Sequence, residues 1–513
     1  MRIAPSVSPA ARFILTALAP VSLYPRVTRL GLSLLGCAFA VASAAQPADG
    51  WTRVRPEEVG MDSAPLLKLF DFVREHQIRV HSLQIVRRGK LVFDAYFYPY
   101  AAGSRHDVAS VTKSITSTLV GLAIEHGHLQ DVNEPLAPGD ADPQKRSITL
   151  EHLLTMQAGW DCGYEPNERR LFEMRQSADW LQFMLDLPMV AQPGTRWAYC
   201  SGNCHVLSAL LTQRTGTNAL AFARRELFEP LGISDVLWSS DARGNNHGWG
   251  DLQLHPLDMA RIGQLFLRRG RWNDRQIIPE RWVTNATHAH VKRTSNNDHY
   301  GYFWWVKGDD YPGMFEAVGR GGQRITVWPA QEMVIVFTGG GFEPGDLAKF
   351  ILNSLKSDTH NHDAARQLKD QIAVAARPPT AKSVSALLSL ATQISGKTFE
   401  LGSNSLGLSS IRFTFSNPVE AQTTVRWGSK WVSFPVGLDG VDRFSLNELN
   451  GLRQAAKGRW VNYQEFILNL DFIGGINNYE LRHTFSRDGE GVKITVSEAT
   501  GLTNERFEGR LPK

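Results

Sequence analysis

Strand-like segments at both ends of a long helical region do most to limit how this chain can fold. Residues 82–86 and 91–97 are rich in apolar residues and flank a glycine turn, which predicts a β-hairpin. Residues 325–329 and 333–337 read as two further buried strands, and a helix is expected near residues 347–355. Strands that enclose helices in this way predict an α+β domain with an antiparallel sheet.

The character of the chain changes near residues 375–380, which are rich in Ala and Pro. Several later runs alternate apolar and polar residues, as expected of an all-β barrel or sandwich. A chain of 513 residues is also too long for one packed domain. We therefore expect a signal peptide at 1–45, an α+β domain at 46–376, a linker at 377–397 and an all-β domain at 398–513.

The first 45 residues resemble an export signal. Arg26 and Arg29 precede an apolar run at residues 30–45, which ends in small residues. This run is shorter than the roughly 20 residues that span a bilayer as a helix, and no later stretch reads as a membrane helix. The sequence therefore predicts a periplasmic or secreted protein with no integral membrane span after signal removal. Lipoprotein anchoring at Cys37 is the less favoured alternative.

Charge and motif content exclude several other functions. The signal region carries four arginines and no acid, so the rest of the chain has 51 basic and 51 acidic residues. A neutral body gives no electrostatic basis for nucleic-acid binding. The P-loop-like run from Ala391 to Thr398 follows a helix and precedes a strand, the reverse of a nucleotide site. We expect no nucleotide, metal or other cofactor.

Ser110 and Lys113 form the first candidate catalytic pair. Ser110 begins a strong helical pattern, so the two side chains lie one turn apart on the same face. The N-terminus of a helix supplies backbone N–H groups where an oxyanion would form. The alternative interpretation is an N-capping serine with a solvated lysine.

A serine–lysine pair needs a third group, because free lysine and tyrosine both have pKa values near 10. Tyr199 is the candidate, since mutual proximity to Lys113 would let one of the two take the serine proton. Gly319, Arg320 and Gly321 come directly before a strand, where glycines permit close backbone approach to a ligand. A packed aromatic residue and a plain tight turn are the alternatives for these two segments.

In combination, these motifs are similar to those of the penicillin-binding protein and class C β-lactamase superfamily of serine hydrolases. The similarity covers roughly residues 55–357 and most resembles the 6-aminohexanoate-dimer hydrolase and carboxylesterase branch. It implies a β-lactamase/transpeptidase-like fold, with helices on both faces of the sheet and an inserted helical region. It also implies Ser110 as nucleophile, Lys113 and Tyr199 as coupled bases, and an oxyanion hole from the Ser110 amide and an amide near Arg320. The motifs that carry it are Ser110-x-x-Lys113, residues 149–156, Pro193-Gly194-Thr195 with Tyr199, and residues 319–323.

Two departures from the β-lactamase pattern favour an ester or linear amide as substrate. Ser201 stands where β-lactamases usually have an asparagine, and the Lys-Thr-Gly triplet is missing unless Arg320 or Arg324 replaces its lysine. The expected function is a serine hydrolase that forms an acyl-enzyme. The alternatives are a β-lactamase or D-Ala-D-Ala carboxypeptidase, and, from another class, a non-catalytic envelope binding protein that retains the fold.

The cysteines and two tryptophans complete the predicted site. After signal removal, Cys162, Cys200 and Cys204 remain, which predicts one disulfide and one free thiol. Sequence does not fix the pairing, but Cys162–Cys200 is favoured because both flank segments placed at the active site. Trp160 and Trp197 adjoin the same segments and are candidates to line an apolar pocket.

Overall fold

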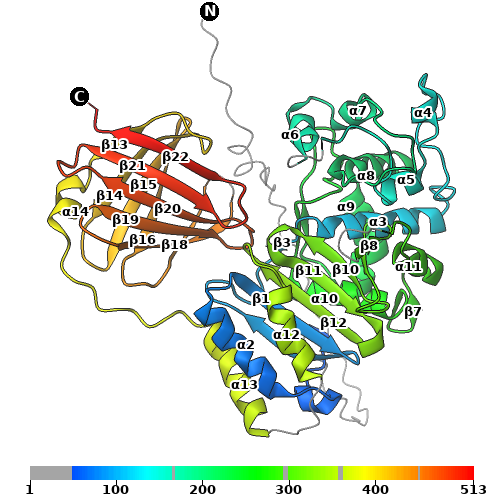
Figure 1. Cartoon of the computed structure of the whole chain (residues 1–513), viewed down its shortest axis with the longest axis horizontal. Coiled ribbons are helices and arrows are strands. Elements are labelled where there is room, and N and C mark those ends of the chain that lie inside the picture. The colour runs from blue at the N-terminus through cyan, green and yellow to red at the C-terminus, as the bar shows by residue number, and fades with distance from the viewer. Residues whose placement is uncertain (1–48, 164–167, 293–297, 356–361, 449–450, 513) are drawn as a thin grey trace, which may run out of the picture.

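The computed structural model describes residues 49–163, 168–292, 298–355, 362–448 and 451–512. They form an α+β domain and a β-barrel that lie beside each other (Figure 1). The expected export signal, including Cys37, lies outside the described residues. In the described part of the chain, no helix has both the length and the apolar character needed to cross a membrane.

A seven-stranded antiparallel sheet forms the centre of the α+β domain. Its spatial order is β2 (Lys90–Tyr96), β1 (Val80–Arg87), β12 (Met333–Gly339), β11 (Gln323–Trp328), β10 (Phe315–Gly319), β9 (Trp305–Lys307) and β8 (Asp298–Tyr300). The early hairpin therefore pairs with the late strands, with Ile85 opposite Ile335. Every residue of β1 and β12 is buried, because helices cover both faces of these central strands. The predicted fold class is confirmed.

Helices pack on the two faces of this sheet in separate apolar cores. One face carries α2 (Ser63–Glu75), α12 (Gly345–Ser354) and α13 (His362–Ala375), and the other carries α3 (Val111–Glu125) and α10 (Pro256–Leu267). Asp62 caps α2 by accepting a hydrogen bond from the Ala64 N–H.

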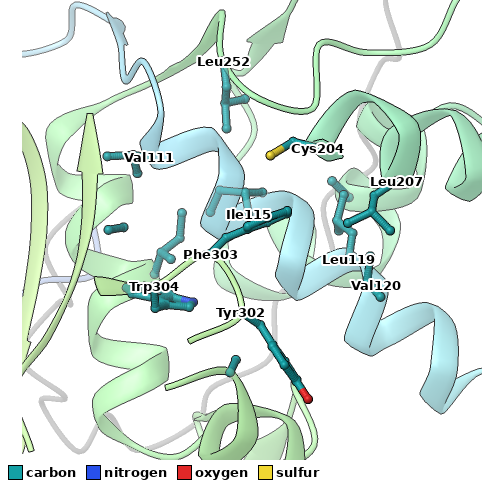
Figure 2. Close-up of a cluster of buried hydrophobic side chains, with 14 of the residues drawn as sticks. Val111, Ile115, Leu119, Val120, Cys204, Leu207, Leu252, Tyr302, Phe303 and Trp304 are labelled. Atoms are coloured by element: carbon teal, nitrogen blue, oxygen red, sulfur yellow. The ribbon is translucent and has the colours of Figure 1, made fainter. Parts of the chain in front are cut away.

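α3 is buried at 13 of its 15 residues and is the central helix of the larger core. Figure 2 shows its apolar side chains, from Val111 to Val120, among Cys204, Leu207 and Phe303. Because its polar residues, such as Lys113 and Thr116, are buried as well, other elements must enclose the helix. Three helices of the inserted region, α8 (Ser201–Thr215), α9 (Ala219–Ala223) and α11 (Glu280–Ala286), pack directly on α3. The region also contains α4 (Pro143–Arg146), α5 (Leu150–Leu154), α6 (Arg169–Gln176) and α7 (Trp180–Leu185).

Short strands complete the α+β domain. A three-stranded sheet joins β3 (His106–Asp107), β5 (Leu252–Leu254) and β4 (Leu237–Trp238), and β6 (Arg271–Trp272) pairs with β7 (Arg275–Gln276). In the first of these sheets, strand β3 ends at Asp107, four residues before α3 begins at Val111.

The C-terminal domain is a closed barrel. Its strands are β13 (Thr398–Leu401), β14 (Leu408–Phe415), β15 (Glu420–Trp427), β16 (Lys430–Gly437), β17 (Arg443–Leu446), β18 (Arg453–Trp460), β19 (Glu465–Phe472), β20 (Asn478–Phe485), β21 (Gly491–Glu498) and β22 (Asn504–Arg510). A parallel pairing of Gly437 with Lys457 joins β16 to β18 and closes the ring, while β17 lies outside the ring against β18. Closure leaves no long unpaired edge.

Part of the stretch expected as a linker packs into this barrel. Ser389–Ile394 forms α14, and Leu390, Ala391 and Ile394 are completely buried in the barrel core. The barrel's packing therefore begins before residue 398. The P-loop-like run begins in helix α14 and ends at the start of strand β13, so a helix precedes a strand here, as the sequence predicted.

Candidate active site

Ser110 lies at the turn between strand β3 and helix α3. The preceding Ala109 has a φ of 48°, and its N–H donates to Asp107 Oδ1 at 2.8 Å. Left-handed backbone at a non-glycine residue costs free energy and is typical of functional turns. Ser110 occupies the N-cap position of α3, but its side chain makes no capping hydrogen bond. The serine hydroxyl is therefore not used to cap the helix, so the structure does not support the alternative interpretation of Ser110 as an N-capping residue.

Lys113 lies one turn into α3 and is 1% exposed, so it is not a solvated lysine. Its Nζ donates to Ser110 Oγ at 2.8 Å and to the Trp249 carbonyl at 3.2 Å. Burial favours the neutral amine, but the electrostatic effects of Tyr199, Cys204 and Glu168 together outweigh it and raise the pKa of Lys113 above its ordinary value. Lys113 is therefore a cation that donates to the serine oxygen.

Tyr199 precedes α8 and completes the group. Its hydroxyl makes hydrogen bonds with Ser110 and Lys113, and the Lys113 Nζ lies 4.8 Å from the centre of its ring. Burial raises the pKa of Tyr199, and the Lys113 ammonium opposes this only in part. The ring also stacks on Trp305 with centroids 6.4 Å apart. The structure thus brings together the three side chains that the sequence proposed.

Glu168 is a site residue that the sequence analysis missed. Its Oε1 accepts the Ser201 N–H at 2.7 Å, and its Oε2 accepts the Ser201 hydroxyl at 3.0 Å. The carboxylate charge also raises the pKa of both Lys113 and Tyr199. Glu168 lies outside every motif of the sequence, so its place in the site becomes apparent only in the structure. Ser201, the residue at the usual asparagine position, therefore points to a carboxylate of this protein.

The glycine turn between β10 and β11 lies against the segment that leads to Ser110. A Cβ on Gly319 would lie 2.5 Å from the Val108 carbonyl oxygen and 3.0 Å from the Ala109 Cβ. Gly321 has a φ of 84°, which favours glycine. This close approach brings the glycine turn against the segment that leads to Ser110, and both line the same cavity.

The Arg320 side chain turns towards the barrel. Its Nη2 donates to Asn477 Oδ1 at 2.9 Å, its Nη1 donates to the Thr500 hydroxyl, and Glu498 lies 3.9 Å away. Arg324, the other arginine considered as a substitute for the triplet lysine, lies 3.3 Å from the Glu316 carboxylate. Both guanidinium groups thus have partners within the protein.

A cavity of about 960 Å³ opens over the catalytic group. Its lining includes the predicted residues Ser110, Tyr199, Ser201, Gly319, Arg320 and Gly321. Trp249 and Trp305 form its aromatic wall, whereas Trp160 and Trp197 are not among its lining residues. Trp160 lies in a separate small pocket, and Trp197 packs edge-on against Tyr300, so adjacency in sequence misplaced both.

Cys162 and Cys200 form a disulfide, with their Cα atoms 5.7 Å apart. The bond ties the loop before α6 to the residue that follows Tyr199. Cys204 is free and buried, and burial raises the pKa of its thiol to about 12. Within the described residues, no group of three or more His, Cys, Asp or Glu side chains is arranged to hold a metal ion.

Comparison with known proteins agrees with this geometry. A family model described as Beta-lactamase matches residues 68–352. The 6-aminohexanoate-dimer hydrolase of Paenarthrobacter ureafaciens is 24% identical over 279 residues, which cover 49% of this chain and 70% of that protein. A β-lactamase of Escherichia coli K12 is 25% identical over 189 residues, which cover 35% of this chain and 48% of the relative.

A solved structure shares the fold of the α+β domain. It belongs to a Bacillus anthracis protein proposed to be a 6-aminohexanoate-dimer hydrolase, with a TM-score of 0.50 and 20% identity. The alignment covers 62% of this chain and 87% of that one. The family match spans more than half of the 513 residues and includes the serine, the lysine, the tyrosine and the glycine turn. The chain therefore belongs to the Beta-lactamase family, within the serine hydrolase superfamily.

Proposed function

We propose that this protein hydrolyses ester or linear amide bonds through an acyl-enzyme on Ser110. The observation that carries the proposal is the 2.8 Å contact of the buried Lys113 Nζ with Ser110 Oγ, beside the Tyr199 hydroxyl. A nucleophile within hydrogen-bond reach of a coupled base is the arrangement that covalent catalysis requires. A binding protein that merely retains the fold has no need of all three groups.

The reactive form of the site is the one in which Tyr199 has lost its proton, stabilised by the Lys113 ammonium. As Ser110 Oγ bonds to the substrate carbonyl carbon, the Tyr199 oxygen takes the serine proton. The carbonyl oxygen gains negative charge beside the Ser110 amide and the glycine turn. Tyr199 then returns the proton to the departing alcohol or amine. Water repeats the sequence, attacking the acyl carbon, releasing the acid and restoring the serine.

The surroundings of the catalytic group favour esters and linear amides over β-lactams. A β-lactam or D-Ala-D-Ala substrate carries a carboxylate that needs a cationic partner. Arg320 and Arg324 already bind groups of the protein, and Ser201 binds Glu168. Loss of a charge-assisted contact costs roughly 1.5–3 kcal/mol, or about 10- to 150-fold in affinity. An ester without a carboxylate does not incur this cost.

Covalent labelling and a substrate comparison test the proposal. A fluorophosphonate should label the wild-type protein on Ser110, and Ser110→Ala should abolish the labelling. The kcat/KM for p-nitrophenyl acetate should exceed that for nitrocefin on the same preparation. Labelling that survives in Ser110→Ala would identify another nucleophile, and a higher value for nitrocefin would favour the β-lactamase alternative.

We also propose that the protein is exported to the periplasm or beyond. The apolar run that ends in small residues near residue 45 supports this proposal. N-terminal sequencing of the mature protein from fractionated cells tests it. Cleavage after the run would support export, cleavage before Cys37 with lipid attached would support anchoring, and an intact N-terminus in the cytoplasm would contradict both.

A further inference from the structure

Two loops of the barrel contribute to the cavity that contains Ser110. One lies between β19 and β20 and supplies Ile476, and the other lies between β21 and β22 and supplies Ala499, Thr500 and Leu502. In Figure 1 the barrel lies on the side of the α+β domain where β3 is found. The described residues of the barrel contain no evident catalytic set, yet the barrel forms part of the wall of this cavity.

The two loops are held firmly in place by Arg320 and Glu498. Arg320 binds Asn477 in one loop and Thr500 in the other, so one side chain of the glycine turn joins both. The Glu498 Oε2 accepts hydrogen bonds from the Thr500 N–H at 3.0 Å, the Thr500 hydroxyl at 2.6 Å and the Leu502 N–H at 3.1 Å. Glu498 thereby fixes the backbone that carries Leu502.

Backbone contacts between the domains are equally close. The Asp107 N–H, three residues before the serine, donates to the Gly474 carbonyl at 2.7 Å. A Cβ on Gly321 would collide with Ile476, and a Cβ on Gly341 would lie 2.6 Å from the Ala499 carbonyl oxygen. Because these glycines have no side chain, the barrel loops can pack directly against the turn beside the active site.

Apolar side chains dominate the part of the wall that the barrel completes. Ile476, Ala499 and Leu502 come from the barrel, and Leu171, Phe172 and Phe342 line the same cavity from the α+β domain. Leu502 is 38% exposed, and burying it against a ligand would gain the free energy that hydrocarbon contact provides. The volume of about 960 Å³ is also far more than an acetyl group needs and falls in the range of drug-sized ligand sites.

From this we infer that the barrel loops and the facing apolar residues form a subsite for a bulky hydrocarbon group of the substrate, on one side of the bond that is cleaved. This inference rests on the proposed hydrolase function and adds a substrate class to it: esters or amides with a medium-length alkyl or aromatic group. The barrel is then a specificity element, because it supplies Ile476 and Leu502 to a site whose reacting groups all come from the other domain.

Chain-length selectivity tests the inference. Methyl esters of acetic to decanoic acid vary the acyl group, and methyl to decyl acetates vary the alcohol, with acid release followed by pH-stat. We expect kcat/KM to rise with chain length in at least one series. Leu502→Ala should lower it about tenfold more for the longest substrates than for methyl acetate. Leu446→Ala is the matched control, because Leu446 is a 66% exposed leucine of the barrel that does not line the cavity.

Three outcomes would overturn the inference: no chain-length preference, a loss in Leu502→Ala that is equal for short and long substrates, or an equal loss in Leu446→Ala. A binding measurement separates this failure from failure of the proposed function. In Ser110→Ala, N-hexyloctanamide should quench the fluorescence of Trp249 and Trp305, which line the cavity. Adding Leu502→Ala should weaken this binding about tenfold. Such binding, together with no turnover of any ester or amide by the wild-type protein, would support the subsite and contradict the hydrolase. Absence of binding would contradict the subsite.

Discussion

Tyr199 should determine how the activity depends on pH. Its reactive form is deprotonated, and burial holds its pKa above the ordinary tyrosine value. The fraction in the reactive form therefore increases as the pH rises through the alkaline range. We expect kcat/KM for p-nitrophenyl acetate, corrected for spontaneous hydrolysis, to increase up to the pH at which the protein unfolds.

The matched variant is Tyr199→Phe, which keeps the ring stacked on Trp305 and removes the hydroxyl. Loss of a positioned general base typically costs 10²- to 10⁴-fold. We expect a fall of about that size in kcat/KM and a flat pH profile. A Tyr199→Phe enzyme with the wild-type slope would assign the titration to another group.

Asp107 makes a second pH-dependent contribution, to stability. Burial, together with the nearby Asp251 carboxylate, raises the pKa of Asp107 to about 7. The unfolded chain ionises this group near pH 4. The folded state is therefore penalised increasingly as the pH rises from about 4 to about 7, and the penalty is constant above that range.

Asp107→Asn keeps an oxygen for the Ala109 N–H and removes the charge. We expect it to raise the free energy of unfolding by about 1–2 kcal/mol at pH 8 and to change it little at pH 4.5. Thermal melts of both proteins at the two pH values measure the difference. A stabilisation that is equal at both values would show that charge is not the cause.

At the scale of elements, the end of β10 determines how closely the glycine turn approaches Ser110. Gly319 has an extended φ of −126°, so alanine there is not strained by its own backbone. Its Cβ would nevertheless press on the Val108 carbonyl and the Ala109 Cβ. A displacement of about 1 Å in the catalytic geometry can cost roughly 10²-fold in rate.

We therefore expect Gly319→Ala to lower kcat for p-nitrophenyl acetate by about 10- to 100-fold while the protein still folds. Gly139→Ala is the control, because a Cβ there would meet nothing within 4 Å. Circular dichroism verifies folding of both variants. Full activity in Gly319→Ala would mean that the turn does not need this close approach.

The elements also show what the sequence could and could not predict. The hairpin at β1 and β2, helix α3 and the strand pair β11–β12 follow from local hydrophobic patterns, which act within a few residues. Half of the ten barrel strands were missed, since strands such as β18 contain glycine, alanine and charged residues and take their identity from neighbouring strands.

Site residues that lie close together in the sequence could be predicted, whereas those brought together by tertiary packing could not. Ser110 and Lys113 share one helix turn, so spacing alone places them together. Glu168 and the barrel loops reach the cavity from segments with no motif, and only tertiary packing brings them there. Trp160 and Trp197 were expected in the cavity because of their sequence neighbours, but adjacency along the chain does not determine the direction of a side chain.

For the whole molecule, Asn478 of β20 is central to how the two domains dock. It is 2% exposed, accepts a hydrogen bond from His81 at 3.2 Å and donates to the Tyr100 hydroxyl at 2.8 Å and to Asp471 at 2.9 Å. Two of these partners belong to the α+β domain. Truncating Asn478 would leave several buried polar groups unsatisfied, each at a cost of about 1–3 kcal/mol.

We expect Asn478→Ala to lower the first melting transition in calorimetry by several degrees and to separate the unfolding of the barrel from that of the α+β domain. Asn462→Ala is the control, because Asn462 is exposed and bonds only to the backbone of its own hairpin in the barrel. If both variants melt like the wild type, the buried network does not hold the domains together.

The contact of the Asp107 N–H with the Gly474 carbonyl has a consequence for biosynthesis. The barrel follows the α+β domain along the chain, so it leaves the ribosome later, and domains generally fold as units in that order. Ser110, Lys113 and Tyr199 can therefore assemble while one wall of the cavity has still to be made. During that interval the nascent protein would have Ser110 open to solvent and only the α+β part of the proposed apolar subsite. Selectivity is then acquired late, when the last loops reach the rim of the cavity.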